Sequence, residues 1–180
     1  IAYAKANPGK VNFGTSGIGT SVDLQGRLLQ QIGGIEVVNV AYRGVASLVP
    51  DLMSGMVDVA VFGLSAVSEQ IRSGTLVGLG ITRRQRLPAF PDIPPISDSV
   101  RGYDFKGWYA LLGPASLSPA IAGKLTAEIA RLQSDKAFID ISARDDEVPL
   151  QMSGATFKDF MAQESKSVAA LVKSANIKVS

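Results

Sequence analysis

The chain has 180 residues, of which 46% are hydrophobic and 19% charged, and its formal net charge at pH 7 is +2. This composition is that of an ordered globular protein, and the length suits either one large domain or two small lobes. The absence of Cys and His excludes disulfides, a thiolate nucleophile, a Ser-His-Asp triad and a Cys/His zinc site, and the absence of a basic stripe with interleaved aromatic residues argues against nucleic acid as a partner.

The first part of the sequence alternates short strands with helices. Strands are expected over residues 10–14, 36–42, 57–62 and 76–82. Helices are expected over residues 1–6, 20–32, 47–54 and 65–72. Pro50 fits the third helix only in its first turn. This alternation predicts an α/β fold with a mainly parallel sheet and helices on both faces.

The pattern changes at a proline-rich segment, residues 87–98, which predicts a stiff, extended linker or lobe crossing. A strand is expected next, over 106–112. Ser118 before Pro119 is a strong helix start, with Ser as the cap and Pro at the first helical position. Three further elements are expected: a helix over 135–143, an edge strand over 147–150 and a last helix from about 153.

The loop from Gly14 to Ser21 joins the first expected strand to the second helix. Its glycines allow a ligand close to the backbone, and its hydroxyls lie beside the free N–H groups of a helix start. It is not a P-loop, because Thr20 stands where the lysine belongs, and it lacks the dinucleotide fingerprint. Two interpretations remain open: a site for a carboxylate, phosphate or sulfate, or a tight turn with capping hydroxyls.

Two more loops, residues 42–47 and 62–65, follow the next two expected strands. Loops at the carboxyl ends of neighbouring parallel strands converge on one crevice, so the three loops together predict a pocket. Arg43 could add a positive charge there, although a solvated surface arginine is the simpler interpretation.

Other candidate residues have simpler structural explanations. Asp145, Asp146 and Glu147 fit a charged loop better than a metal site, and Trp108 with Tyr109 fits a half-buried strand pair better than a ligand-stacking pair. No nucleophile–base pair and no S-x-x-K motif is present. We therefore expect no active site, no metal and no cofactor.

Several short motifs occur in a characteristic order along the whole chain. They include AKANPGK from Ala4 to Lys10, VAYRG from Val40 to Gly44, GMVDVAVF from Gly55 to Phe62, PDIP from Pro91 to Pro94, and the aromatic strand from Trp108 to Pro114. On these motifs the chain resembles the substrate-binding proteins of tripartite tricarboxylate transporters, the Bug (Bordetella uptake gene) or TctC-like family.

The resemblance implies a periplasmic-binding-protein-like fold of type II, with two lobes and helices on both faces of parallel-rich sheets. Residues 1–97 would be the second lobe, and residues 98–180 the hinge crossing and the C-terminal part of an incomplete first lobe. Because a helix begins at Ile1 without a capping residue before it, we expect further sequence upstream.

The resemblance also implies which residues bind the ligand. They are Gly14, Thr15, Ser16, Gly19, Thr20, Ser21, Gly44, Val45, Ala46, Ser47, Phe62, Gly63 and Leu64. Two positions depart from the family pattern. Asp23 stands where many members have His and adds a negative charge near an anion site, and Gly63 stands where amino-acid-binding members have Asp, which argues against an amino acid ligand.

The expected function is that of a periplasmic, non-enzymatic protein that binds a small carboxylate and delivers it to the membrane components of a tripartite tricarboxylate transporter. Ligand contact with both lobes would favour the closed state. Two alternatives remain: an effector-binding domain of a transcription regulator, and an enzyme that uses the glycine-rich loop as an oxyanion site.

Overall fold

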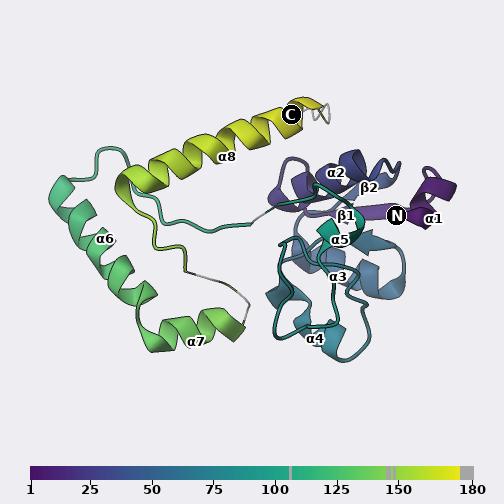
Figure 1. The fold of residues 1–180 in the computed structure, drawn as a ribbon, viewed down its shortest axis with the longest axis horizontal. Coiled ribbons are helices and arrows are strands. Elements are labelled where there is room, and N and C mark those ends of the chain that lie inside the picture. The colour runs from purple at the N-terminus through teal and green to yellow at the C-terminus, as the bar shows by residue number, and fades with distance from the viewer. Residues whose placement is uncertain (106, 145–146, 148, 175–180) are drawn as a thin grey trace. The chain divides into compact units, whose positions relative to one another are not determined.

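The computed structural model describes residues 1–105, 107–144, 147 and 149–174 (Figure 1). The chain divides into two compact units. The first comprises Ile1–Gly107 and Ser167–Ser180, and the second comprises Trp108–Lys166.

The first unit contains the predicted parallel sheet. Its strands are β1 (Asn12–Thr15), β2 (Val38–Ala41) and β3 (Val59–Ala60), in the order β2-β1-β3. Both neighbours run parallel to β1, with Phe13 opposite Asn39 on one side and Val59 on the other. The sheet confirms the α/β interpretation, although its strands are shorter than the sequence pattern indicated.

The fourth expected strand is wrong. Residues 76–82 lie within the described part of the chain and contain only an isolated bridge, from Ile81 to Pro95. A side chain at Gly78 would collide with Ile93, and one at Gly80 with Ile96. The segment therefore packs through its glycines onto residues 93–96 instead of joining the sheet, in keeping with the poor strand propensity of glycine.

The helices of the first unit surround this sheet. They are α1 (Ala2–Ala6), α2 (Ser21–Gly33), α3 (Val45–Ser54), α4 (Ser68–Arg72), α5 (Ile96–Ser99) and the 3₁₀ helix η1 (Leu64–Ala66). Because α3 begins at Val45, Pro50 lies in its second turn and not in the first as expected. The helix expected over 65–72 is divided at Val67 between η1 and α4. The proline-rich segment 87–98, expected to be stiff and extended, contains a Leu87–Phe90 bridge and the start of α5.

Helices α2 and α3 cover opposite faces of the sheet. Successive residues of a strand point to opposite faces of the sheet. On one face, the side chain of Phe13 lies against Gly26 of α2. On the other face, Leu48 of α3 occupies the space that a side chain at Gly14 would fill. Phe13 and Leu48 are 2% and 0% exposed, so both helix–sheet contacts are closed to solvent. The predicted arrangement of helices on both faces is confirmed.

The outer side of α2 carries a second apolar cluster. Leu24 and Leu28 pack with Leu171, and the flanking residues of that cluster are Phe105, Val168 and Val172. Leu171 belongs to α8 (Gly154–Ser174), whose residues from Ser167 onward are part of the first unit. This packing anchors α2, the helix that begins at the glycine-rich loop.

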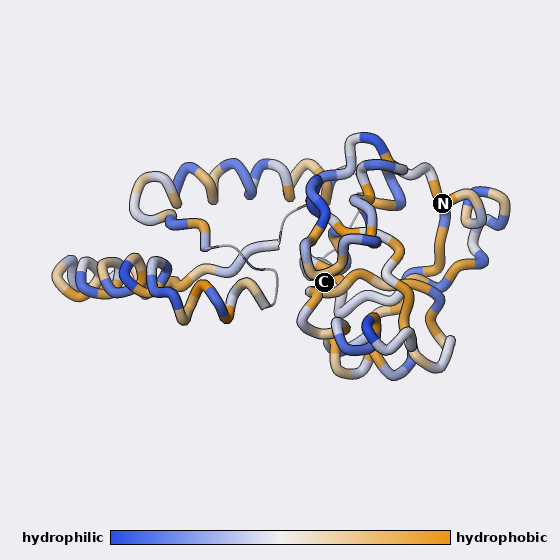
Figure 2. Tube along the Cα trace, turned by 60° about the horizontal axis from the view of Figure 1, so that its bottom comes forward, coloured by the Kyte–Doolittle hydropathy of each residue, from blue (hydrophilic) through white to orange (hydrophobic). Residues whose placement is uncertain are grey.

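The regular secondary structure described in the second unit is helical. It contains α6 (Pro119–Gln133), α7 (Lys136–Arg144) and the first part of α8. The Ser118 hydroxyl accepts the N–H of Ile121 at 3.3 Å, so the predicted cap of α6 is confirmed. The long helices show alternating hydrophobic and hydrophilic stretches along the tube (Figure 2).

An aromatic cluster lies inside the second unit. The ring centroids of Trp108 and Phe160 are 5.5 Å apart in an edge-on arrangement, and Trp108 Nε1 donates to Glu164. Tyr109 is 89% exposed, so the expected half-buried pair is wrong in its second member.

The two strands expected in this part of the chain are wrong where they can be described. Residues 107–112, and Glu147, Pro149 and Leu150, are in no strand. A strand needs a neighbour for its backbone N–H and C=O groups, and the described residues of the second unit contain no such neighbour. Lys106, Asp145, Asp146 and Val148 lie outside the described residues, so the predicted charged loop at 145–147 is described only at Glu147.

Candidate functional site

The three predicted loops do meet at one edge of the sheet. They follow β1, β2 and β3, which are adjacent and parallel, so their carboxyl ends share an edge. After β1 the chain runs through α2 to β2 on one side, and after β2 it runs through α3 to β3 on the other side (Figure 1). Open α/β sheets bind ligands where the strand order reverses in this way.

The glycine-rich loop is a tight turn closed by a helix cap. The Thr20 hydroxyl donates to the Gly17 carbonyl at 2.7 Å and accepts the Asp23 N–H at 3.3 Å, which makes Thr20 the N-cap of α2. Gly17 and Gly19 have φ values of +128° and +77°, which side chains disfavour. Gly14 is buried in β1 and leaves room for Leu48, so its visible role is packing. The capped-turn interpretation therefore describes the local structure well.

Most of the loop hydroxyls bind within the loop itself. The Thr15 hydroxyl donates to the Gly17 carbonyl at 3.3 Å, and Ser16 Oγ lies 3.2 Å from Thr20 Oγ1. Because Thr20 gives its proton to Gly17, Ser16 is the donor of that last pair. Ser21 is exposed, and its hydroxyl has no partner among the residues that the structure describes. Of the four hydroxyls expected to face a ligand, only that of Ser21 is available in this conformation.

Backbone N–H groups are the other available donors. The first N–H groups of an α-helix have no acceptor within the helix and carry the positive end of its dipole. This applies to Ser21 and Val22 at the start of α2, and to Val45 and Ala46 at the start of α3. The edge can therefore offer several donors to an anion without a charged side chain.

Asp23 is a buried carboxylate directly beneath the loop. It is 1% exposed, and its Oδ2 accepts the Gly19 N–H at 3.0 Å and Arg27 Nε at 2.9 Å. Its other oxygen, Oδ1, has no partner among the described residues. Arg27 therefore balances the negative charge that the sequence placed near the anion site. Arg27 was not predicted as a site residue, although its four-residue spacing from Asp23 on one helix was a usable signal.

The second loop joins β2 to α3. Gly44 is the N-cap residue with a φ of +141°, and its carbonyl accepts from the Ser47 hydroxyl at 3.1 Å. Tyr42 N–H donates to the Thr15 carbonyl at 2.8 Å, which ties this loop to the end of β1. Arg43 is exposed, which agrees with its interpretation as a solvated surface residue.

Tyr42 also anchors α3. Its hydroxyl donates to Asp51 at 2.7 Å, and this hydrogen bond, with smaller contributions from burial and from the Asp51 charge, raises the pKa of Tyr42. Asp51 was not singled out in the sequence, because a nine-residue separation across a turn carries no periodic signal.

The third loop contributes backbone more than side chains. Phe62 is half-buried, and Gly63 precedes η1 in an extended conformation. Leu64 packs beside the cluster of Leu87, Phe90 and Ile93. The thirteen predicted residues thus lie in the three loops or in the strand and helix ends that flank them, and of these Gly14 and Leu64 are engaged in packing.

The donors at this edge are those that anion binding requires. The N–H donors at the starts of α2 and α3 suit a carboxylate. No group of three His, Cys, Asp or Glu residues that could hold a metal occurs in the described part of the chain. In an open parallel sheet, a donor-lined edge at the point of strand reversal is where α/β proteins bind small ligands.

The family follows from comparison with known proteins. Residues 1–177 match the model of the tripartite tricarboxylate transporter family receptor, TctC, and the chain belongs to this family. Protein BugT of Bordetella pertussis is 30% identical over 99% of this chain and 55% of its own length. The UPF0065 protein in the clcB-clcD intergenic region of Pseudomonas knackmussii is 33% identical over 71% of this chain and 79% of its own length.

Solved structures show the same fold. Periplasmic binding protein BugD has a TM-score of 0.88 at 23% identity, with 98% of this chain and 60% of that chain covered. The Rpa4515 protein of R. palustris with adipate has a TM-score of 0.85 at 23% identity, over 98% and 59%. MatC of Rhodopseudomonas palustris with bound malate has a TM-score of 0.81 at 20% identity, over 95% and 60%. These confirm the periplasmic-binding-protein-like fold.

The chain spans only part of most of its relatives. It covers 39%, 45%, 44% and 55% of the length of four curated relatives that it matches. Of the helices that the structure describes, none combines the length and the apolar composition needed to cross a bilayer.

Proposed function

We propose that this chain is part of a periplasmic receptor that captures a small carboxylate and delivers it to the membrane components of a tripartite tricarboxylate transporter. The observation that carries the proposal is the sheet edge at which the strand order reverses, where the starts of α2 and α3 present free N–H groups. Two solved proteins with this fold are described with adipate and with bound malate, both small dicarboxylates, which supports the ligand class.

The binding step requires no proton transfer. One carboxylate of the ligand accepts hydrogen bonds from the N–H groups that begin α2 and α3 and from the Ser21 hydroxyl. Hydrogen bonds to a charged group contribute about 1.5–3 kcal/mol each, so two or three of them orient a small acid. Gly63 provides no side chain for a ligand amine, which favours a simple carboxylic acid over an amino acid.

Closure of two lobes on the ligand is the proposed conformational step. Residues 1–97 would belong to the second lobe, and residues 98–180 to the crossing and the first lobe. A ligand that touches both lobes binds the closed state more tightly and shifts the population toward it. The carrier role uses this shift and needs no covalent chemistry, in keeping with a non-enzymatic receptor.

A thermal-shift panel tests the ligand class. The panel contains mono-, di- and tricarboxylates, aromatic acids, amino acids and phosphate. A ligand at 100 times its Kd adds about 2.7 kcal/mol to the free energy of unfolding. A selective rise in Tm with one class of carboxylate is expected, and no rise with any acid would contradict the proposal for this chain.

Two variants at one position test the proposed donors. Ser21 is the first helical residue of α2 and follows Thr20 with φ −70° and ψ 162°, a conformation that accepts a following proline. Ser21→Ala removes only the hydroxyl, whereas Ser21→Pro removes the hydroxyl and the N–H. We expect Ser21→Ala to lower the affinity about fivefold. Ser21→Pro should lower it by a further factor of about ten or more. Equal affinities of both variants and the parent would exclude this helix start from the site.

A further inference from the structure

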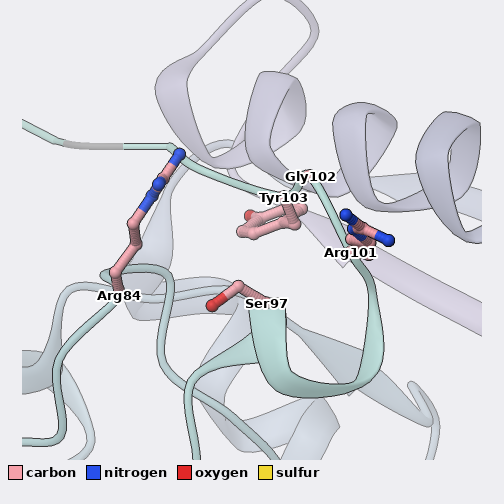
Figure 3. Close-up of a pocket in the computed structure, with 5 residues that line it drawn as sticks. All are labelled: Arg84, Ser97, Arg101, Gly102 and Tyr103. Atoms are coloured by element: carbon pink, nitrogen blue, oxygen red, sulfur yellow. The ribbon is translucent and has the colours of Figure 1, made fainter.

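A pocket of about 350 Å³ lies within the first unit, away from the residues of the three loops. Its lining residues are Arg84, Ser97, Arg101, Gly102 and Tyr103. Figure 3 shows Arg84 and Arg101 on opposite sides, with Tyr103 and Ser97 between them. The volume falls within the range of small-molecule sites.

The walls of the pocket are held in place. Tyr103 is 1% exposed, its hydroxyl donates to the Gln25 carbonyl at 3.3 Å, and its N–H donates to Val100. Gly102 has a φ of +92°, and this left-handed turn separates Arg101 from the buried Tyr103. The base of the pocket is therefore fixed by the buried Tyr103.

The charge of the lining is one-sided. It contains two guanidinium groups and no carboxylate. Arg84 Nε binds Asp104 Oδ2 at 3.0 Å, which orients the guanidinium and leaves its two terminal nitrogens as donors. Arg101 is exposed and forms no ion pair with any residue that the structure describes. Both guanidinium groups reach solvent, since Arg101 is exposed and the Arg84 side chain is 70% exposed, so both are accessible to an anion.

We propose that this pocket is a second anion site, which takes the carboxylate, phosphate or sulfate group of a small molecule. Arg84 and Arg101 supply paired N–H donors, the geometry that guanidinium groups use for planar and tetrahedral oxyanions. The Ser97 hydroxyl adds a neutral donor, and the buried Tyr103 and the turn at Gly102 hold the base of the pocket in place. Asp104 limits the affinity because its charge opposes that of the anion.

The proposal predicts opposite effects of two substitutions. Inorganic phosphate, sulfate and acetate are titrated into the ¹⁵N-labelled chain at 0.15 M ionic strength, and the arginine Nε–Hε signals are followed. Arg101→Gln should weaken binding about tenfold, whereas Asp104→Asn should strengthen it several-fold. Arg43→Gln, an exposed arginine on the β2–α3 loop, is the matched control and should leave these shifts unchanged.

The outcomes separate this site from the proposed carboxylate edge. In Ser21→Pro, binding at the arginine pocket should persist, whatever becomes of binding at the edge. The relative shifts with the three anions identify the preferred oxyanion. The proposal is overturned if the Arg84 and Arg101 signals do not move. It is also overturned if Arg43→Gln weakens binding as much as Arg101→Gln, or if Asp104→Asn has no effect. Either of these last two results would indicate unspecific screening of surface charge.

Discussion

Replacement of Gly26 by Ala should destabilise the protein, although alanine is the better helix former. Gly26 is a buried residue inside α2, and an added Cβ would lie 2.5 Å from Cζ of Phe13 and closer still to Cε1. Phe13 is 2% exposed and belongs to the central strand, which is bonded on both sides. The ring therefore cannot move away without displacing β1 or α2.

The expected magnitude is the difference of two effects. Alanine gains about 1 kcal/mol over glycine in a helix interior. Overpacking of a closed core costs about 1–3 kcal/mol, and the upper end applies here because the ring is held in the middle of the sheet. The free energy of unfolding should fall by about 2 kcal/mol, which lowers Tm by roughly 4–8 °C in a chain of this length.

The second unit offers a matched control. Gly123 lies inside α6, and an added Cβ there would meet no atom within 4 Å. Gly123→Ala should therefore stabilise its unit by up to about 1 kcal/mol. Urea unfolding followed by far-UV circular dichroism, with Trp108 fluorescence as a probe of the second unit, measures both variants. If Gly26→Ala proved as stable as the parent, the close contact between α2 and the sheet would be refuted.

Two further predictions concern buried polar groups. Asp23→Asn should lower the free energy of unfolding by about 1–3 kcal/mol, less than for a fully buried pair because the Arg27 side chain is 23% exposed. The double variant Asp23→Asn/Arg27→Gln should recover part of this loss in urea unfolding, and no recovery would mean that the pair is not coupled. Burial raises the pKa of Tyr103 above its usual 10.0, so above pH 10 the unfolded chain loses a proton that the folded chain keeps. Stability should therefore fall there by up to about 1.4 kcal/mol per pH unit, and Tyr103→Phe should flatten the fall; an unchanged slope would contradict this.

Helix positions were predictable because their signals are local. The sequence indicated helices over 20–32 and 135–143, and the structure has α2 at Ser21–Gly33 and α7 at Lys136–Arg144. The cap at Ser118 was predicted from two residues alone. A helix forms its hydrogen bonds between residues four apart, so its own sequence contains most of the necessary information.

The position of the candidate site was predictable for a related reason. Glycines and hydroxyls at the start of α2 indicated a turn at the end of a strand, and the alternating pattern indicated a parallel sheet, whose carboxyl edge collects the loops. The conclusion that three separate loops share one edge needed only the order of elements along the chain.

The tertiary structure alone decided how the polar groups of that site are used. Thr15, Ser16 and Thr20 carry the expected hydroxyls, but their bonds go to the loop itself, and Asp23 takes the Gly19 N–H. Residues 76–82 have a strand-like sequence but pack through glycines onto residues 93–96. Strand pairing and side-chain partners depend on which distant residues arrive nearby, and that information lies in the packed fold and not in any local stretch of sequence.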